Sequence, residues 1–277
     1  MEPLEPRYTA ELFRPLLREL TTLLRSLEPE MWDRSTVTGS WRVRDIVAHL
    51  LDGDLRRLAI CRDGHAIATE PITSDRDLAR FINRLNAEGV AYGARLSGQL
   101  LVDLLAVTGE WVAEYFSALP LHDRAMFSVS WAGESVSENW MDIGREYTER
   151  WHHQMQIRDG VGQPRLLSPV WLEPLIELSI RVLPPAYAAI AAPAGSTVTL
   201  QVHGETEGSW TLLREGSSWQ LYRGHTAAPT TVVLAGADDV WRLFFNALPA
   251  DAASERVAVE GDRLLAAPLL GARSVIV

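Results

Sequence analysis

The period of the hydrophobic residues changes near residue 193, and this change divides the chain into two kinds of structure. Between Tyr8 and Leu27, leucines recur every three or four residues, which is typical of one face of a helix. Comparable patterns continue to about residue 190. Thr197 to His203 alternates instead and is rich in β-branched residues, a pattern typical of a strand. We therefore predict a helical domain over residues 1–192 and an α+β domain over residues 193–277.

The helical part is predicted to form a four-helix bundle. Ser40 is expected to cap the second helix. The third segment, from Ser74 to Phe116, is either one long helix or two, broken near Gly89 or Gly93. A long connection is expected over residues 120–138. The predicted helices cover about residues 8–27, 40–62, 74–116 and 139–158, with a fifth over 168–190 that packs on the bundle or leads onward.

The C-terminal part predicts a small antiparallel sheet with one or two helices. Glu215-Gly216-Ser217 is a turn that separates two of the strands. The strands are expected over residues 197–203, 209–213, 218–222, 230–234 and 257–260, and a helix is expected over 238–248.

Charge and composition exclude several classes of function. The 277 residues carry a formal net charge of −10 with a pI near 5.2, and an acidic surface repels nucleic-acid phosphates. The chain has no lysine and one cysteine, Cys61, which excludes a Schiff-base lysine and an internal disulfide. It shows neither a signal peptide nor an apolar run long enough to cross a membrane. We therefore expect a cytoplasmic protein that binds neither nucleic acid nor membrane, as a monomer or a dimer.

Three candidate metal ligands stand in two of the predicted helices. Glu149 and His153 are four residues apart, so a helix places them on one face. His49 lies in a second helical run about a hundred residues earlier. Two imidazoles and one carboxylate form the kind of ligand set that a catalytic zinc site uses while it keeps one position open. Nickel or iron would also accept these ligands.

Each half of this pattern also has an ordinary structural interpretation. A histidine on an apolar helix, such as His49, is commonly a hydrogen-bonded core residue. Glu149 and His153 would by themselves be a common solvated pair. His152 stands three residues after Glu149, which makes it a competing ligand.

Two carboxylates flank His49 at a distance of about one helical turn. We predict that Asp45 or Asp52 supports a ligand histidine or serves as an acid in the pocket. Asp45 could instead cap the start of its helix.

The helix around His49 resembles the first signature of the DinB-like bundle family. In Trp41-Arg42-Val43-Arg44-Asp45-Ile46-Val47-Ala48-His49, the tryptophan, the Arg-Asp pair and the histidine are spaced as in mycothiol-dependent maleylpyruvate isomerases. Glu149 and His153, followed by Gln154, are similar to the second signature of that family. Val259-Glu260-Gly261-Asp262 resembles the sterol-carrier-like (SCP2-like) module that follows the bundle, so the resemblance covers nearly the whole chain.

The resemblance implies that His49, Glu149 and His153 are the metal ligands and that a low-molecular-weight thiol is the cosubstrate. A thiol has a pKa near about 8.5 in water, and an open zinc position would hold it as the nucleophilic thiolate. In an isomerase, the thiolate would add to an activated cis double bond and leave after rotation; in an S-transferase, it would stay on the product. Without lysine, an acidic small-molecule substrate would be held by an arginine. The sequence does not rank the candidates Arg44, Arg145, Arg150, Arg223, Arg256 and Arg273.

A different class of function is also compatible with the sequence. The bundle could be stabilised by its metal without being an enzyme, while the C-terminal domain binds a lipid, another apolar ligand or a partner. Trp210, Trp219 and Trp241 would line such a cleft, although tryptophans in these settings are more often core residues.

Overall fold

The computed structural model describes residues 1–65, 73–248 and 250–275. Contacts group the chain into two compact units. The helical unit comprises Tyr8–Met126 and Glu149–Arg165, and the sheet unit comprises Met1–Arg7, Phe127–Thr148 and Leu166–Ile276. The predicted domain boundary at residue 193 falls inside the sheet unit, and the division of the chain into domains at this residue stays a prediction.

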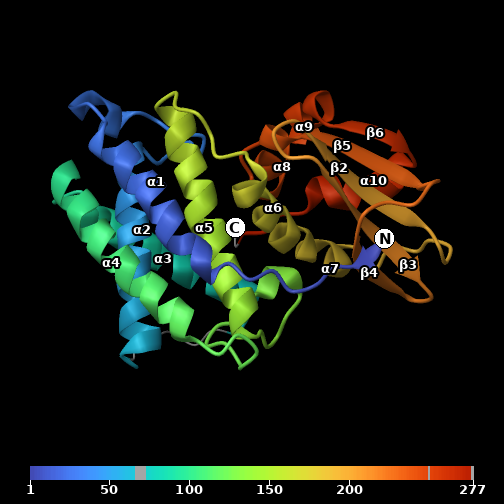
Figure 1. The fold of residues 1–277 in the computed structure, drawn as a ribbon, viewed down its shortest axis with the longest axis horizontal. Coiled ribbons are helices and arrows are strands. Elements are labelled where there is room, and N and C mark those ends of the chain that lie inside the picture. Colours follow the sequence, from blue (N-terminus) through green and yellow to red (C-terminus); the bar gives the residue numbers. More distant parts are fainter. Residues whose placement is uncertain (66–72, 249, 276–277) are drawn as a thin grey trace. The chain divides into compact units, whose positions relative to one another are not determined.

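The helical unit is built from long helices, as the leucine spacing predicts (Figure 1). The third predicted segment is two helices, broken after Gly93. The second helix passes into a π-helical turn that ends at Arg62, as predicted. The helices are α1 (Phe13–Arg25), α2 (Val43–Arg57), α3 (Asp75–Gly93), α4 (Gly98–Ala118) and, from residue 149 onward, α5 (Asn139–Gly160).

Short polar side chains fix where several of these helices begin. Ser97 Oγ accepts the backbone N–H of Leu100 at 3.2 Å at the start of α4. At the start of α2, the Asp45 carboxylate accepts the backbone N–H of Arg42 at 2.9 Å. The prediction that Ser40 caps α2 is wrong, because the chain becomes helical only after Arg42. The backbone N–H of Arg42 is instead bonded by the carboxylate of Asp45, which lies in the first turn of the helix.

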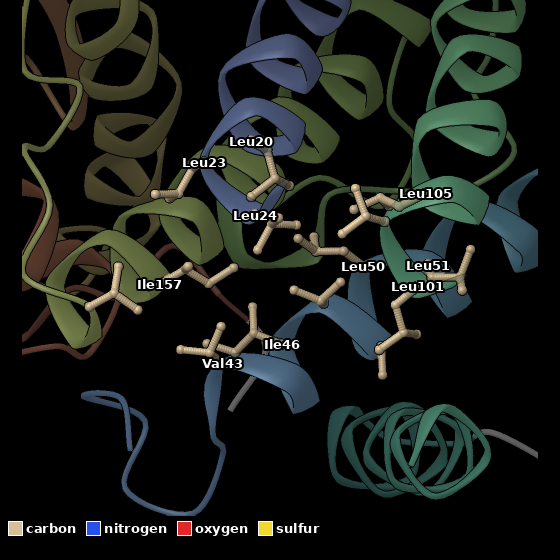
Figure 2. Packing of buried hydrophobic residues seen from close by; sticks show 14 residues of the cluster. Leu20, Leu23, Leu24, Val43, Ile46, Leu50, Leu51, Leu101, Leu105 and Ile157 are labelled. Atoms are coloured by element: carbon tan, nitrogen blue, oxygen red, sulfur yellow. The ribbon is translucent and has the colours of Figure 1, made fainter. Parts of the chain in front are cut away.

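The core of the helical unit lies between α1, α2, α4 and the end of α5. Figure 2 shows leucines of α1 and α4 gathered with the apolar side chains of α2. Those of α4 lie beside Leu50 and Leu51, and Ile157 of α5 lies on the side of Val43 and Ile46. Helix α3 also packs against α2, through a glycine at the end of α3. A Cβ added at Gly93 would lie 2.3 Å from the Cβ of Ala48, so the two helices approach too closely for a larger residue.

The sheet unit contains a six-stranded sheet in the order β1-β4-β3-β2-β5-β6 (Figure 1). All five predicted strands are present, each displaced by no more than about two residues. Both faces of β2 are covered at its start, and Leu200 pairs with Trp210 on one side and Val233 on the other. The strands are β1 (Glu2–Pro3), β2 (Thr197–His203), β3 (Gly208–Glu215), β4 (Ser218–Arg223), β5 (Thr231–Gly236) and β6 (Ala258–Gly261).

The sheet is mixed, which corrects the antiparallel prediction. Strand β5 pairs with β2 in parallel, whereas the remaining neighbours among the described strands are antiparallel. Residues 224–230 connect the end of β4 to the start of β5. This segment crosses β3 and β2, because β5 pairs with the edge of β2 that β3 does not occupy. Neighbouring strands are about 4.8 Å apart, so seven residues are long enough for this crossing.

Helices cover this sheet and include residues that precede position 193. The predicted helix over 168–190 is two helices separated by a 3₁₀ turn, since Pro184 and Pro185 lack the amide hydrogens that a continuous helix needs. Tyr187 is fully buried, and its hydroxyl donates to Leu265 O at 2.7 Å and accepts the N–H of Leu269 at 3.2 Å. The helices are α6 (Pro169–Ser179), α7 (Leu183–Ala186), α8 (Ala237–Phe244), α9 (Ala250–Arg256) and α10 (Arg263–Gly271).

The predicted fold class, a helical N-terminal part followed by an α+β part, is confirmed. Trp210, Trp219 and Trp241 are buried core residues. Within the described residues, no helix is both long and apolar enough to span a bilayer.

Candidate metal centre

The three predicted ligands come together inside the helical unit. His49 lies in the middle of α2, and Glu149 and His153 lie one turn apart on α5. One ligand atom from each of these three side chains lies within 4.8 Å of the others. His153 Nε2 is 3.6 Å from Glu149 Oε2. This separation suits donors that face a shared cation, because each donor would sit about 2.0–2.2 Å from zinc.

The indole ring of Trp41 lies beside the two imidazoles. The His49 and His153 rings meet edge to face, with their centroids 4.8 Å apart. The half-buried Trp41 lies 5.0 Å from His49 and 6.2 Å from His153. Its backbone is held by Thr36, whose hydroxyl and amide donate to Trp41 O at 2.8 and 3.2 Å. The tryptophan of the sequence motif is therefore a wall of the site.

A buried amide accompanies His153. His153 Nδ1 lies 2.8 Å from Gln156 Oε1. His153 is 7% exposed and Gln156 is 4% exposed. Gln156 is not among the site residues predicted from the sequence. The available signal was its spacing, since a residue three positions after a helical histidine shares its face.

Burial keeps His153 in the form that a metal needs. Removal from water holds the pKa of His153 well below its ordinary value, and the neighbouring His152 lowers it further. The ring is therefore neutral at neutral pH. Because an imidazole must be neutral to donate to a metal, the environment and the donor set of this site fit a divalent cation.

The other histidines do not join this group. His152 is buried and its ring centroid is 4.1 Å from that of His153. Among the described residues, however, the cluster of potential ligand atoms is formed by His49, Glu149 and His153, without His152. The prediction that the remaining four histidines are surface residues is confirmed, because all four are exposed: His65, His122, His203 and His225.

The two carboxylates predicted to support the site have partners on their own helix. Asp45 bonds the backbone at the start of α2, which is the capping role considered as its alternative. Asp52 pairs with Arg56 at 2.7 Å. Burial nevertheless raises the pKa of the Asp52 carboxyl, against the lowering effect of Arg56. A role of either carboxylate beside the metal stays a prediction.

The arginines considered as substrate contacts are largely engaged in ion pairs. Arg150, next to Glu149 in sequence, pairs with Asp54 at 2.5 Å. Arg273 differs, since it donates to the main-chain oxygens of Leu270 and Ala272. The candidates in ion pairs with acidic residues are Arg44, Arg145, Arg150, Arg223 and Arg256.

Comparison with known proteins gives one family and one fold. The family described as the mycothiol maleylpyruvate isomerase N-terminal domain matches residues 13–158, more than half of the chain, a range that contains all three candidate ligands. Among curated proteins, none matches the sequence.

Solved structures extend the similarity beyond that range. A crystal structure of the mycothiol-dependent maleylpyruvate isomerase is 13% identical and covers 91% of this chain and 92% of its own, with a TM-score of 0.52. A variant of that isomerase with a histidine replaced by alanine is 14% identical over the same shares, with a TM-score of 0.51. At these identities the similarity shows a common fold. Sterol carrier protein 2 like 2 from Aedes aegypti is 20% identical over 34% of this chain and 93% of its own, but its TM-score of 0.28 is too low to establish a shared fold.

Proposed function

The chain belongs to the family of the mycothiol maleylpyruvate isomerase N-terminal domain, and from this membership we propose that it is a metal-dependent isomerase or S-transferase with a low-molecular-weight thiol as cosubstrate. The observation that carries the proposal is the convergence of His49, Glu149 and His153 within 4.8 Å. We place this activity in the reducing cytoplasm, where a free thiol persists.

The ligands are proposed to hold one divalent ion, most directly zinc, although nickel or iron would accept the same donors. When bound, the ion would supply a Lewis acid that keeps a thiol in its thiolate form at neutral pH. His153 needs to lose no proton to accept the ion, because burial already keeps its ring neutral. Glu149 contributes one negative charge, so the site would retain a net positive charge toward an anionic cosubstrate.

The chain provides orientation and exclusion of water rather than a nucleophile of its own. Trp41 covers one side of both imidazoles and limits the approach of solvent. In the non-enzymatic alternative, the bundle is stabilised by its metal while the C-terminal part binds an apolar ligand or a partner, for which three tryptophans were considered as the lining of a cleft. No observation favours it, because those tryptophans are packed in the core of the sheet unit.

The proposal is tested by following maleylpyruvate with zinc-loaded protein in the presence and absence of mycothiol. We expect turnover that requires the thiol, is lost in His49→Ala, and is retained in His122→Ala, which alters an exposed histidine. An isomerase returns the thiol unchanged, whereas an S-transferase incorporates it into the product. Absence of turnover, or equal turnover without thiol, would overturn the proposal.

A further inference from the structure

Gln156 follows His153 by one turn of α5, and both side chains are buried in the helical unit. The amide oxygen of Gln156 lies 2.8 Å from His153 Nδ1. We propose that Gln156 is a positioning residue that fixes His153 as the tautomer with its proton on Nδ1, so that Nε2 presents its lone pair to the metal. This inference rests on the proposed metal centre.

The chemistry of the two groups determines the tautomer. A neutral imidazole has one nitrogen that donates and one that accepts, and a carbonyl oxygen can only accept. The proton must therefore reside on Nδ1 of His153 when Gln156 Oε1 faces it. The nitrogen left with a lone pair is Nε2, which is also the atom 3.6 Å from Glu149 Oε2. The opposite tautomer would place the lone pairs of two acceptors against each other and direct an N–H at the metal.

The same helix offers a natural comparison. Gln154 is also buried, but in the amide orientation that satisfies its neighbours it donates to Leu16 O at 3.3 Å and accepts the N–H of Leu20 at 3.1 Å. Gln154 therefore joins α5 to α1, while Gln156 bonds a ligand. Removal of either amide creates a buried defect, but only one of the two changes should alter the His153 ring.

A neutral amide orients the ring without adding charge behind it. A carboxylate in its place would also accept from Nδ1 and would make the histidine a more basic ligand. Gln156→Glu should therefore preserve the tautomer and hold zinc at least as tightly as the native residue. Gln156→Leu removes the acceptor, and loss of such a supporting partner typically weakens metal binding by about 10- to 100-fold.

The first measurement uses metal-free protein, so that it does not depend on metal binding. Long-range ¹⁵N–¹H correlation spectra report which ring nitrogen of His153 carries the proton. We expect Nδ1–H in the native protein, in Gln154→Leu and in Gln156→Glu, and a mixture or Nε2–H in Gln156→Leu. If the leucine variant does not fold, Gln156→Met offers an unbranched side chain of similar length without the acceptor.

The second measurement is the zinc dissociation constant, obtained by competition with a chromophoric chelator. We expect zinc binding to weaken by about 10- to 100-fold in Gln156→Leu and to be as tight as in the native protein, or tighter, in Gln156→Glu. In Gln154→Leu we expect the zinc dissociation constant to change by no more than about twofold. Persistence of Nδ1–H in Gln156→Leu, or zinc affinity equal to that of the native protein, would overturn the inference. Failure of every form to bind zinc would overturn the metal proposal instead, and the spectra of the metal-free protein would still decide the role of Gln156.

Discussion

Arg150 and Asp54 form an ion pair inside the helical unit, beside the proposed ligand Glu149. The guanidinium and carboxylate are 2.5 Å apart, and their side chains are 16% and 3% exposed. Thr108 Oγ1 donates to the second carboxylate oxygen at 3.0 Å, and the guanidinium lies 5.4 Å from the centre of the Phe13 ring. Such a pair is tolerated inside a protein because its hydrogen bonds compensate the loss of hydration.

Removal of one partner should therefore be costly. We predict that Asp54→Ala lowers the free energy of unfolding by about 3–5 kcal/mol, because the buried guanidinium of Arg150 loses its ion pair with Asp54. The control is Glu110→Ala, which breaks the exposed pair with Arg14 and should cost about 1 kcal/mol or less. Urea denaturation measures both, and equal small losses would mean that the Asp54 pair is solvated.

The stability of the metal-free protein should also depend on pH through His153. The unfolded chain protonates this ring near about pH 6.5, whereas the folded chain does so only well below that value. The contribution of the neutral ring is fully present above about pH 6.5 and is lost as the pH falls toward the folded pKa. We predict that the native protein loses up to about 1.4 kcal/mol per pH unit relative to His153→Gln in this window. Parallel pH profiles of the two proteins would contradict this.

At the scale of elements, Gly93 sets the distance between α3 and α2. A Cβ at this position would meet Ala48, the neighbour of His49, at 2.3 Å. We predict that Gly93→Val costs about 1–3 kcal/mol, since overpacking forces the two helices apart.

Gly53 provides the matched control for this prediction. It lies within α2, and a Cβ there meets nothing within 4 Å. Gly53→Ala should stabilise the protein by about 0.5–1 kcal/mol through helix propensity alone. Thermal denaturation distinguishes the two changes, and a neutral Gly93→Val would show that α3 packs more loosely than described.

The sequence predicts the elements better than it predicts their neighbours. Leucine spacing locates α1, and alternation locates β2 over its full length, because both patterns are local. The parallel partner of β2 and the two-residue strand β1 depend on contacts far along the chain, which no local period encodes. The break between α6 and α7 could have been predicted from Pro184 and Pro185.

The candidate site also combines features that are local in the sequence with contacts between distant parts of the chain. The face shared by Glu149 and His153 is a property of one helix, so the sequence indicates it directly. Their approach to His49 depends on how α2 and α5 pack, and the family resemblance supplied that information. Gln156 was missed because a polar residue three positions after a histidine is common. Its hydrogen bond to the His153 ring is visible only in the folded structure.

At the scale of the whole molecule, Tyr187 links residues before position 193 to the C-terminal sheet unit. Its hydroxyl bridges Leu265 and Leu269 of α10, and its ring lies 5.2 Å from that of Trp219. We predict that Tyr187→Phe costs about 1–3 kcal/mol, because two buried main-chain groups lose their partner. Hydrogen exchange of the β2 amides measures this loss. Unchanged exchange would support independent folding of residues 193–277.

We propose that His49, Glu149 and His153 together bind one metal ion. Elemental analysis of zinc-loaded, desalted protein tests it most directly. We predict about one zinc per chain in the native protein and in His122→Ala, and strong depletion in His49→Ala, Glu149→Ala and His153→Ala. Equal zinc in the native protein and His49→Ala, or loss of zinc in His152→Ala with retention in His153→Ala, would contradict it.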